Sequence, residues 1–161
     1  QKFILLMQKI EDDIATIFMQ VACYTFEINL HTSFKEKGYL SKEQISEIFL
    51  AAFAPLYGSI IDFEPTKFKW VSWPHIRTYF YVYSYASGLL ISKSLQNSVK
   101  NNPEYINKVK EFLRAGTSKS PKDIFLNLGI DITKKEFWDK GLNEVEDLIN
   151  QAKALKVKLN K

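Results

Sequence analysis

Apolar side chains recur along the start of the chain in alternating steps of four and three. They stand at Phe3, Met7, Ile10, Ile14, Ile17, Val21, Tyr24 and Ile28. This spacing places them on one face of an α-helix and predicts a helix of about thirty residues. A seven-residue repeat also occurs in coiled coils, but a single stretch of this length is more typical of a long packed helix. Because the pattern is already in register at Gln1, we expect the chain to be a piece of a longer protein.

Capping and turn residues divide most of the remaining chain into further helices. Ser41–Gln44 has the pattern of a capping box, and Asn102 and Ser120 each precede a proline, as is typical of helix starts. Residues 58–73 have no helical period and are predicted to form a loop whose apolar side chains pack. The predicted helices cover residues 41–57, 102–116, 120–129 and the segment that follows a second capping box at 133–136.

The last of these helices carries its apolar residues on one predicted face. That face consists of Trp138, Leu142, Val145, Ile149 and Ala152. No strand pair, internal repeat or low-complexity linker competes with the helical pattern. The sequence therefore predicts an all-α bundle of long helices, with residues 1–161 as a single segment.

Four tyrosines occupy alternate positions from Tyr79 to Tyr85. Period-two alternation favours a strand, but the apolar spacing of residues 88–95 continues the run as a helix. We predict a tyrosine helix that reaches about Lys100, with the tyrosines paired four residues apart. Either these rings belong to a core helix with hydroxyls at its rim, or they form a row of neutral donors that binds carbonyl oxygens in a cleft.

Composition and charge exclude several classes of protein. An apolar fraction of 46% with 14% aromatic residues excludes a disordered chain. The net charge of +4 comes from a C-terminal tail that contains Lys153, Lys156, Lys158 and Lys161. Without these four, the 22 basic residues fall to 18 and equal the 18 acidic residues. The rest of the chain is neutral, so we expect no nucleic-acid partner.

The cellular setting is inferred from apolar runs and from cysteine use. No apolar run approaches the length of a membrane span, and no signal peptide opens the chain. Cys23 is the single cysteine and lies in a helical pattern, where a buried structural role is expected. We therefore expect a cytoplasmic protein with no membrane partner.

Few residues offer catalytic chemistry. The sequence contains no His-Glu-x-x-His, cysteine pair at metal spacing, phosphate-binding glycine loop or Gly-x-Ser-x-Gly elbow. Its two histidines are His31, for which a capping or surface role is expected, and His75, which precedes the tyrosines. Gln20 and Glu27 lie seven residues apart on one helical face, which suggests a structural hydrogen bond or support of a neighbouring site.

Three segments carry a resemblance to one family. Pro74-His75 followed by residues 80–88 resembles the substrate-binding helix of oligoendopeptidase F, one of the thimet-oligopeptidase-like zinc metallopeptidases. Residues 16–27 resemble the helix just after that family's zinc-binding region, and residues 112–132 resemble its C-terminal region. The segments occur in the family's order and span nearly the whole chain.

This resemblance implies the C-terminal part of a zinc-dependent metalloendopeptidase that hydrolyses short peptides. The family's zinc ligands, two histidines and a glutamate, lie upstream of the matched segments. Zinc is thus expected in the intact parent and not on this segment, which would be inactive alone. The implied partners are short peptides and the upstream part of the same polypeptide, and we expect the separate segment to self-associate.

The resemblance also assigns roles to the tyrosines. Alignment with the family's helix makes Tyr83 the candidate that donates to the carbonyl oxygen where negative charge develops. His75 resembles the histidine that contacts a substrate carbonyl, and Tyr79, Tyr81 and Tyr85 are further substrate-binding candidates. Without the resemblance, a non-catalytic helical module that binds peptides or serves as a scaffold would explain the same pattern.

Overall fold

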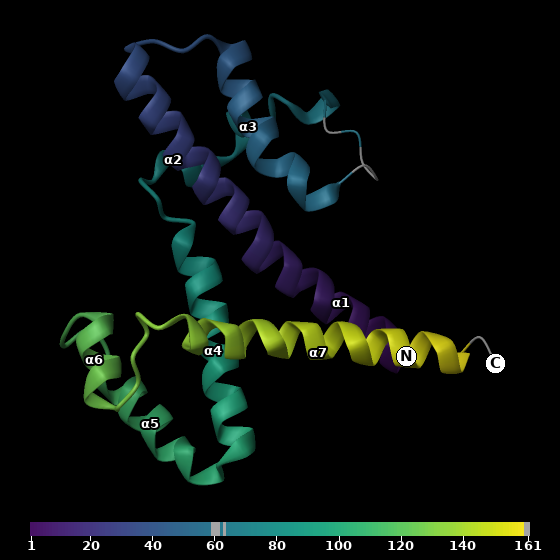
Figure 1. Ribbon diagram of the computed structural model, residues 1–161, viewed down its shortest axis with the longest axis vertical. Coiled ribbons are helices and arrows are strands. Elements are labelled where there is room, and N and C mark those ends of the chain that lie inside the picture. Colours follow the sequence, from purple (N-terminus) through teal and green to yellow (C-terminus); the bar gives the residue numbers. More distant parts are fainter. Residues whose placement is uncertain (59–61, 63, 160–161) are drawn as a thin grey trace. The chain divides into compact units, whose positions relative to one another are not determined.

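The computed structural model describes residues 1–58, 62 and 64–159, and these residues are almost entirely helical (Figure 1). The α-helices are α1 (Lys2–Ile14), α2 (Gln20–Lys37), α3 (Lys42–Tyr57), α4 (Tyr83–Asn101), α5 (Ile106–Ala115), α6 (Pro121–Asn127) and α7 (Lys135–Leu159). A π-helical turn covers Ala15–Met19, and 3-10 turns cover Glu64–Thr66, Lys69–Ser72, Pro74–Arg77 and Pro103–Tyr105. No strand occurs in the described part of the chain, so the predicted all-α fold is confirmed. None of the described helices is long and apolar enough to cross a membrane.

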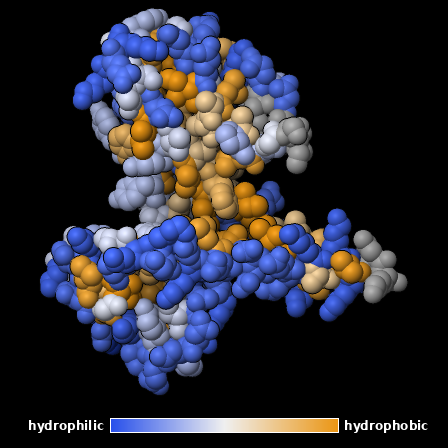
Figure 2. All heavy atoms as spheres, in the orientation of Figure 1, coloured by the Kyte–Doolittle hydropathy of each residue, from blue (hydrophilic) through white to orange (hydrophobic). Residues whose placement is uncertain are grey.

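The chain divides into two compact units. One consists of residues 12–87, and the other combines residues 1–11 with residues 88–161. Hydrophilic residues cover most of the visible surface of each unit, and hydrophobic residues reach it in places (Figure 2). The expectation of a single segment over residues 1–161 stays a prediction.

The predicted long helix is present, but a π turn changes which side chains it buries. α1, the π turn and α2 form one helical run that ends at Gly38, whose positive φ suits a C-terminal cap. A π turn adds a residue to one turn and so rotates the residues that follow about the helix axis. Of the predicted face, Ile10 and Ile17 are buried, whereas Met7 and Ile14 before the π turn and Val21 and Ile28 after it are exposed. The buried residues after the π turn are Ala22, Cys23, Phe26 and Glu27.

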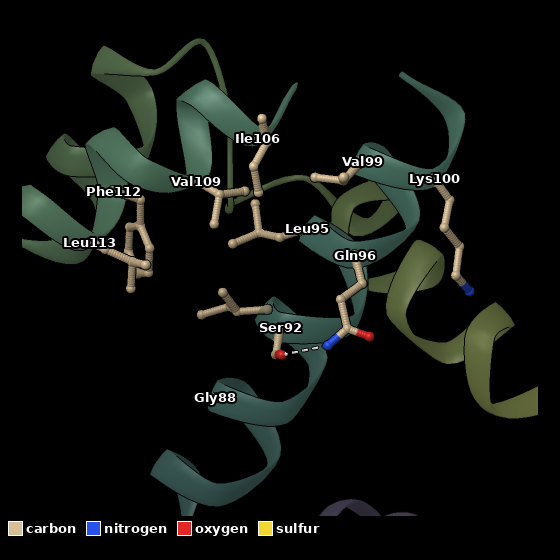
Figure 3. Close-up of a pocket in the computed structure, with 11 residues that line it drawn as sticks. Gly88, Ser92, Leu95, Gln96, Val99, Lys100, Ile106, Val109, Phe112 and Leu113 are labelled. Carbon is tan, nitrogen blue, oxygen red and sulfur yellow. Dashed lines mark hydrogen bonds between the residues drawn. The ribbon is translucent and has the colours of Figure 1, made fainter. Parts of the chain in front are cut away.

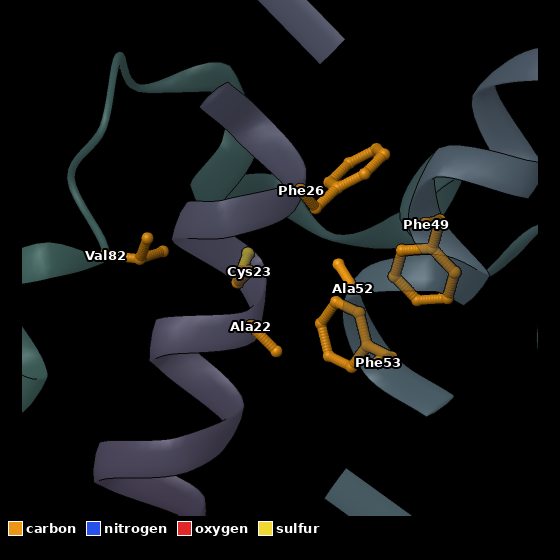
Figure 4. Packing of buried hydrophobic residues seen from close by; sticks show 7 residues of the cluster. All are labelled: Ala22, Cys23, Phe26, Phe49, Ala52, Phe53 and Val82. Carbon is orange, nitrogen blue, oxygen red and sulfur yellow. The ribbon is translucent and has the colours of Figure 1, made fainter. Parts of the chain in front are cut away.

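The core of the unit formed by residues 12–87 lies between α2 and α3, which pack as an antiparallel pair (Figure 4). Phe49 stacks on Phe53 at a centroid distance of 4.4 Å and meets Phe26 edge to face at 5.4 Å. Burying a phenylalanine ring stabilises the folded state by about 1.5–3 kcal/mol, so this trio dominates the local packing. The predicted capping box opens α3, since Ser41 Oγ accepts from Gln44 N and Gln44 Oε1 accepts from Ser41 N.

A second core fills the unit that contains α4 to α7. It consists of Leu95, Phe125, Ile130 and Phe137, and Phe112 stacks on Phe125 at 4.6 Å. α4 and α7 approach closely at Gly141, where an added Cβ would lie 2.7 Å from the carbonyl oxygen of Leu90. Ser94 Oγ also donates to the carbonyl oxygen of Phe137 across this contact, at 2.6 Å.

Two of the three predicted helix starts in this unit are confirmed and one is wrong. The Asn102 side chain accepts from Glu104 N, and Ser120 Oγ accepts from Asp123 N, so both caps are present. The second capping box is wrong, because the Thr133 hydroxyl donates to Asp131 Oδ1 and α7 begins only at Lys135. The predicted apolar face of α7 is partly correct. Val145 and Ala152 are buried as predicted, but Phe137 and Gly141 are buried in place of Trp138 and Leu142.

Candidate functional site

The tyrosines lie in a turn and not wholly in a helix. Trp73 is extended, Pro74 opens a 3-10 turn, and α4 begins only at Tyr83. The predicted tyrosine helix is therefore wrong before Tyr83, and residues 79–85, here called the tyrosine segment, start outside it. Within the first part of this segment, odd positions face solvent and even positions face the protein, as the period-two pattern suggests. The exposed fractions are 85% at Tyr79, 44% at Tyr81 and 62% at Tyr83, against 0% at Val82.

Phe80 is the reason why the helix does not start earlier. Its φ of 55° is left-handed, a conformation that an L residue with a bulky side chain rarely adopts. Such a residue costs about 1–2 kcal/mol and interrupts a right-handed helix. Its backbone N–H is not paired with another backbone group but donates to Glu27 Oε1 at 2.6 Å. Glu27, fully buried on α2, thus makes the structural hydrogen bond that was one of its two expected roles.

The structure brings His75, Tyr81 and Tyr85 together in one cluster. His75 Nε2 lies 2.9 Å from the Tyr85 hydroxyl, a hydrogen bond whose donor depends on the histidine tautomer. The His75 and Tyr81 rings are nearly parallel at a centroid distance of 5.8 Å, and Tyr81 meets Tyr85 edge to face at 5.5 Å. His75 Nδ1 is buried and has no hydrogen-bond partner among the described residues. Three of the five predicted site residues therefore form one group.

Tyr79 and Tyr83 lie outside this cluster. Tyr79 is 85% exposed, and Tyr83 is 62% exposed at the first position of α4. Within the described residues neither phenol hydroxyl has a hydrogen-bond partner, and the expected contact between the two rings four residues apart is absent. The Tyr83 hydroxyl is therefore free to meet a ligand.

Tyr81, Tyr83 and Tyr85 together present phenol hydroxyls as hydrogen-bonding groups. A hydrogen bond with the Tyr81 phenol raises the pKa of Tyr85, so this hydroxyl stays protonated at neutral pH. A protonated phenol is a donor as well as an acceptor. Such groups can donate hydrogen bonds to carbonyl oxygens.

Metal-binding residues are not gathered anywhere in the described parts of the chain. No group of three or more His, Cys, Asp or Glu side chains there is arranged to hold a metal ion. His31 is 48% exposed on α2, beside Glu27 at 3.9 Å, and His75 belongs to the tyrosine cluster. A catalytic zinc site needs three protein ligands, which these residues do not provide.

Sequence comparison identifies the family. Residues 2–144 match peptidase family M3. The chain belongs to this family. The match includes the helical run at the start, the tyrosine segment and the first part of α7.

Individual relatives from the curated proteins agree with this assignment. The chain is 31% identical to an oligoendopeptidase F homolog of Borreliella burgdorferi over 144 residues, which cover 88% of this chain and 24% of that protein. It is 27% identical to oligopeptidase PepF of Bacillus subtilis, over 95% of this chain and 24% of the relative. For chromosomal oligoendopeptidase F of Lactococcus lactis subsp. cremoris, the values are 26% identity, 94% of this chain and 27% of the relative.

The chain thus spans about a quarter of the length of the curated relatives that it matches. No solved structure is a significant match to it. Membership of family M3 makes the chain peptidase-related.

Two further features of this family M3 chain were not predicted from its sequence. Arg77 holds the turn before the tyrosines by donating to the carbonyl oxygens of Trp73 at 3.1 Å and Val71 at 2.5 Å. The left-handed Phe80 had no sequence signal, because glycine, asparagine or aspartate would mark such a position. Both features fix the backbone conformation in and just before the tyrosine segment.

An apolar pocket between α4 and α5 was also not predicted (Figure 3). Its volume is about 650 Å³, and Ile91, Leu95 and Val99 of α4 face Val109 and Phe112 of α5 across it. The apolar spacing of residues 88–95 predicts a helix but does not indicate a pocket on it. Apart from Gly88, no residue near the tyrosine segment lines this pocket.

Proposed function

We propose that this chain is the C-terminal part of a zinc-dependent oligopeptidase and supplies one wall of the cleft that binds short peptides. The match to family M3 over residues 2–144 carries the proposal. The names of the relatives, oligoendopeptidase F and oligopeptidase PepF, support oligopeptides as the substrate class. We place the enzyme in the cytoplasm, where a lone thiol such as that of Cys23 stays reduced.

In this proposal the tyrosine segment and His75 bind the peptide backbone. His75, Tyr81 and Tyr85 act as one hydrogen-bonding surface for substrate carbonyls, and Tyr79 lies at the exposed edge of that surface. The buried and unpartnered His75 Nδ1 supports a ligand contact, since a buried polar atom is normally hydrogen-bonded. The substrate would supply that partner.

Tyr83 is the proposed catalytic residue. When water attacks the carbonyl carbon of the scissile peptide bond, the carbonyl oxygen gains negative charge. A phenol O–H aimed at that oxygen binds the transition state more tightly than the substrate. The exposed and unpartnered hydroxyl of Tyr83 supports this role. Removing one such donor typically costs about a hundred- to a thousand-fold in rate, or about 3–4 kcal/mol.

The proposed enzyme is zinc-dependent, and we assign its metal to a segment other than the described residues of this chain. They offer no three-ligand group, and the resemblance assigns two histidines and a glutamate to an upstream segment. We therefore propose that the metal belongs to that segment of the same polypeptide. The roles proposed above concern only how residues of this chain bind and orient a peptide.

The test is to express the whole coding sequence in which this chain lies and assay it on internally quenched peptides. We expect cleavage of short peptides, loss of cleavage with a chelator and recovery with zinc. A coding sequence without a His-Glu-x-x-His segment, or a purified product that binds peptides without cleaving them, would contradict the proposal. That outcome would favour the non-catalytic helical module.

A further inference from the structure

Three side chains of α2 converge on Phe80. Tyr24, Glu27 and His31 are spaced three and four residues apart, so they share one face of α2. The Phe80 ring lies between two of them, with centroid distances of 5.5 Å to Tyr24 and 5.4 Å to His31. The third, Glu27, accepts the Phe80 backbone N–H at 2.6 Å. These three residues, here called the α2 clip, thus hold both the ring and the backbone of one residue.

The clip holds the residue whose backbone is left-handed. A left-handed phenylalanine persists only where its surroundings over-determine it. A carboxylate that accepts a backbone N–H makes a charge-assisted hydrogen bond, which is stronger than a bond between neutral groups. Burying a carboxylate is costly without such a partner, so Glu27 and the Phe80 N–H each satisfy the other. The other oxygen, Glu27 Oε2, is buried without a partner among the described residues, which leaves this bond as its main one.

The held residue is connected directly to the tyrosines. The carbonyl oxygen of Phe80 accepts from the backbone N–H of Tyr83 at 3.4 Å, at the start of α4. Two residues after Phe80, Val82 is fully buried beside the α2–α3 core. Tyr81 lies between these two anchored positions and therefore faces the other way, toward His75. The backbone conformation of Phe80 thus sets the direction in which residues 81–85 continue into α4.

We propose that the α2 clip positions the tyrosine segment for peptide binding, with Glu27 as a positioning residue that acts through Phe80. This inference rests on the proposed function, because it assigns a purpose to the placement of Tyr83. It adds a requirement to the proposed function, because the tyrosine hydroxyls are positioned to bind a peptide only while Phe80 stays left-handed. Misplacing a reacting group by about 1 Å can cost about a hundred-fold in rate.

Glu27→Met tests the clip in this chain without any assay of activity. Methionine is similar in length but cannot accept the Phe80 N–H, whereas Glu27→Gln keeps an acceptor oxygen at the same place. By nuclear magnetic resonance, we expect Glu27→Met to raise the hydrogen-exchange rate of the Phe80 amide at least about ten-fold. We also expect it to shift the signals of Tyr81, Tyr83 and Tyr85. Glu27→Gln should restore most of both properties.

The matched control is Glu36→Gln, on an exposed position of the same helix. It should change neither the Phe80 amide nor the tyrosine signals. An unchanged hydrogen-exchange rate of the Phe80 amide in Glu27→Met would overturn the proposal. Faster exchange at Phe80 without any shift of the tyrosine signals would overturn it as well. If circular dichroism shows that Glu27→Met does not fold, Phe80→Ala replaces it, because alanine removes the ring that Tyr24 and His31 contact and, unlike glycine, does not adopt positive φ freely. Unmoved tyrosine signals in Phe80→Ala would likewise overturn the proposal.

The kinetic arm uses the longer polypeptide that carries this chain. Glu27→Met should lower kcat by about ten-fold or more at temperatures well below unfolding, and Glu27→Gln should recover most of it. A folded Glu27→Met enzyme with unchanged kcat would overturn the positioning role. If the unsubstituted polypeptide cleaves no peptide while the resonance results hold, the proposed function fails and the clip stands. The two failures are therefore distinguishable.

Discussion

At Tyr83, replacing tyrosine by phenylalanine removes one hydroxyl group and changes little else. In the longer polypeptide we expect Tyr83→Phe to lower kcat and kcat/KM together by about a hundred-fold, with KM little changed. This pattern follows if the hydroxyl binds mainly the transition state. Steady-state kinetics on a quenched peptide measure it, with His75→Ala as the contrast, since loss of a ground-state contact should also raise KM. If Tyr83→Phe leaves kcat unchanged while Tyr81→Phe or Tyr85→Phe lowers it strongly, the donor is that other tyrosine and not Tyr83.

Gly141 and Gly88 give a matched pair of residue-scale tests. A methyl group at Gly141 would meet backbone atoms of Leu90 at 2.7 and 3.2 Å, so α4 and α7 must separate. We expect Gly141→Ala to lower the free energy of unfolding by about 1–3 kcal/mol despite alanine's better helix propensity. At Gly88 an added Cβ meets nothing within 4 Å, and Gly88→Ala should stabilise α4 by about 0.5–1 kcal/mol. Urea unfolding measures both, and a stabilised Gly141→Ala would refute the close approach.

Between the elements α4 and α7, Glu144 carries a pH-dependent contact. Its carboxylate accepts from Asn97 Nδ2 at 2.7 Å and pairs with Lys100. The hydrogen bond from Asn97, followed by that from Lys100, lowers the pKa of Glu144 below its usual value of 4.5. A lowered folded-state pKa stabilises the fold fully above the unfolded pKa, and this stabilisation is lost as the pH falls through the folded pKa.

Glu144→Gln should therefore cost about 1 kcal/mol of unfolding free energy at pH 7 and less near pH 3, because the stabilisation begins to decline once the pH falls below the unfolded pKa. Urea unfolding at the two pH values gives the comparison. The exposed Glu146 on the same helix supplies the control, since Glu146→Gln should alter stability little at either pH. Equal losses for Glu144→Gln at both pH values would show that the contact is not ionic.

Local signals predicted the starts of three helical segments. Ser41, Asn102 and Ser120 cap them as expected, because a cap depends only on residues within one turn. The left-handed Phe80 is instead held by a residue far along the chain, since Glu27 lies 53 positions before it. The candidate site shows the same division. The resemblance singled out five site residues, but only the fold shows that His75, Tyr81 and Tyr85 are grouped while Tyr79 and Tyr83 are exposed.

For the whole chain, we expect no tight zinc binding and no peptidase activity in isolation. Among the described residues, no three His, Cys, Asp or Glu side chains are grouped as a catalytic zinc site requires. Metal analysis after dialysis and a quenched-peptide assay on the purified 161-residue chain test this. Stoichiometric zinc, or cleavage that a chelator abolishes, would contradict the assignment of the metal to another segment. Added zinc should not restore activity to the chain.

Self-association of the separate chain is a second whole-molecule prediction. Apolar side chains reach solvent on the rim of the α4–α5 pocket and on α1. The exposed fractions are 41% at Ile106, 70% at Leu113, 61% at Ile4 and 66% at Leu5. Contiguous exposed apolar surface is uncommon on monomers. We expect sedimentation to show concentration-dependent oligomers that Leu113→Lys weakens, with Glu36→Lys as a control. A monodisperse monomer at high concentration would contradict it.

The sole cysteine lies in the contact between α2 and α3. Cys23 is 1% exposed, and desolvation by burial, followed by the charge of Glu27, raises the pKa of its thiol to about 12. The nucleophile is the thiolate, so this sulfur is inert while the helices stay together. A thiol reagent can label it only when that helix pair opens, and the labelling rate then counts openings. Labelling of Cys23, measured by mass spectrometry, therefore reports local unfolding of the α2–α3 pair without the introduction of another cysteine.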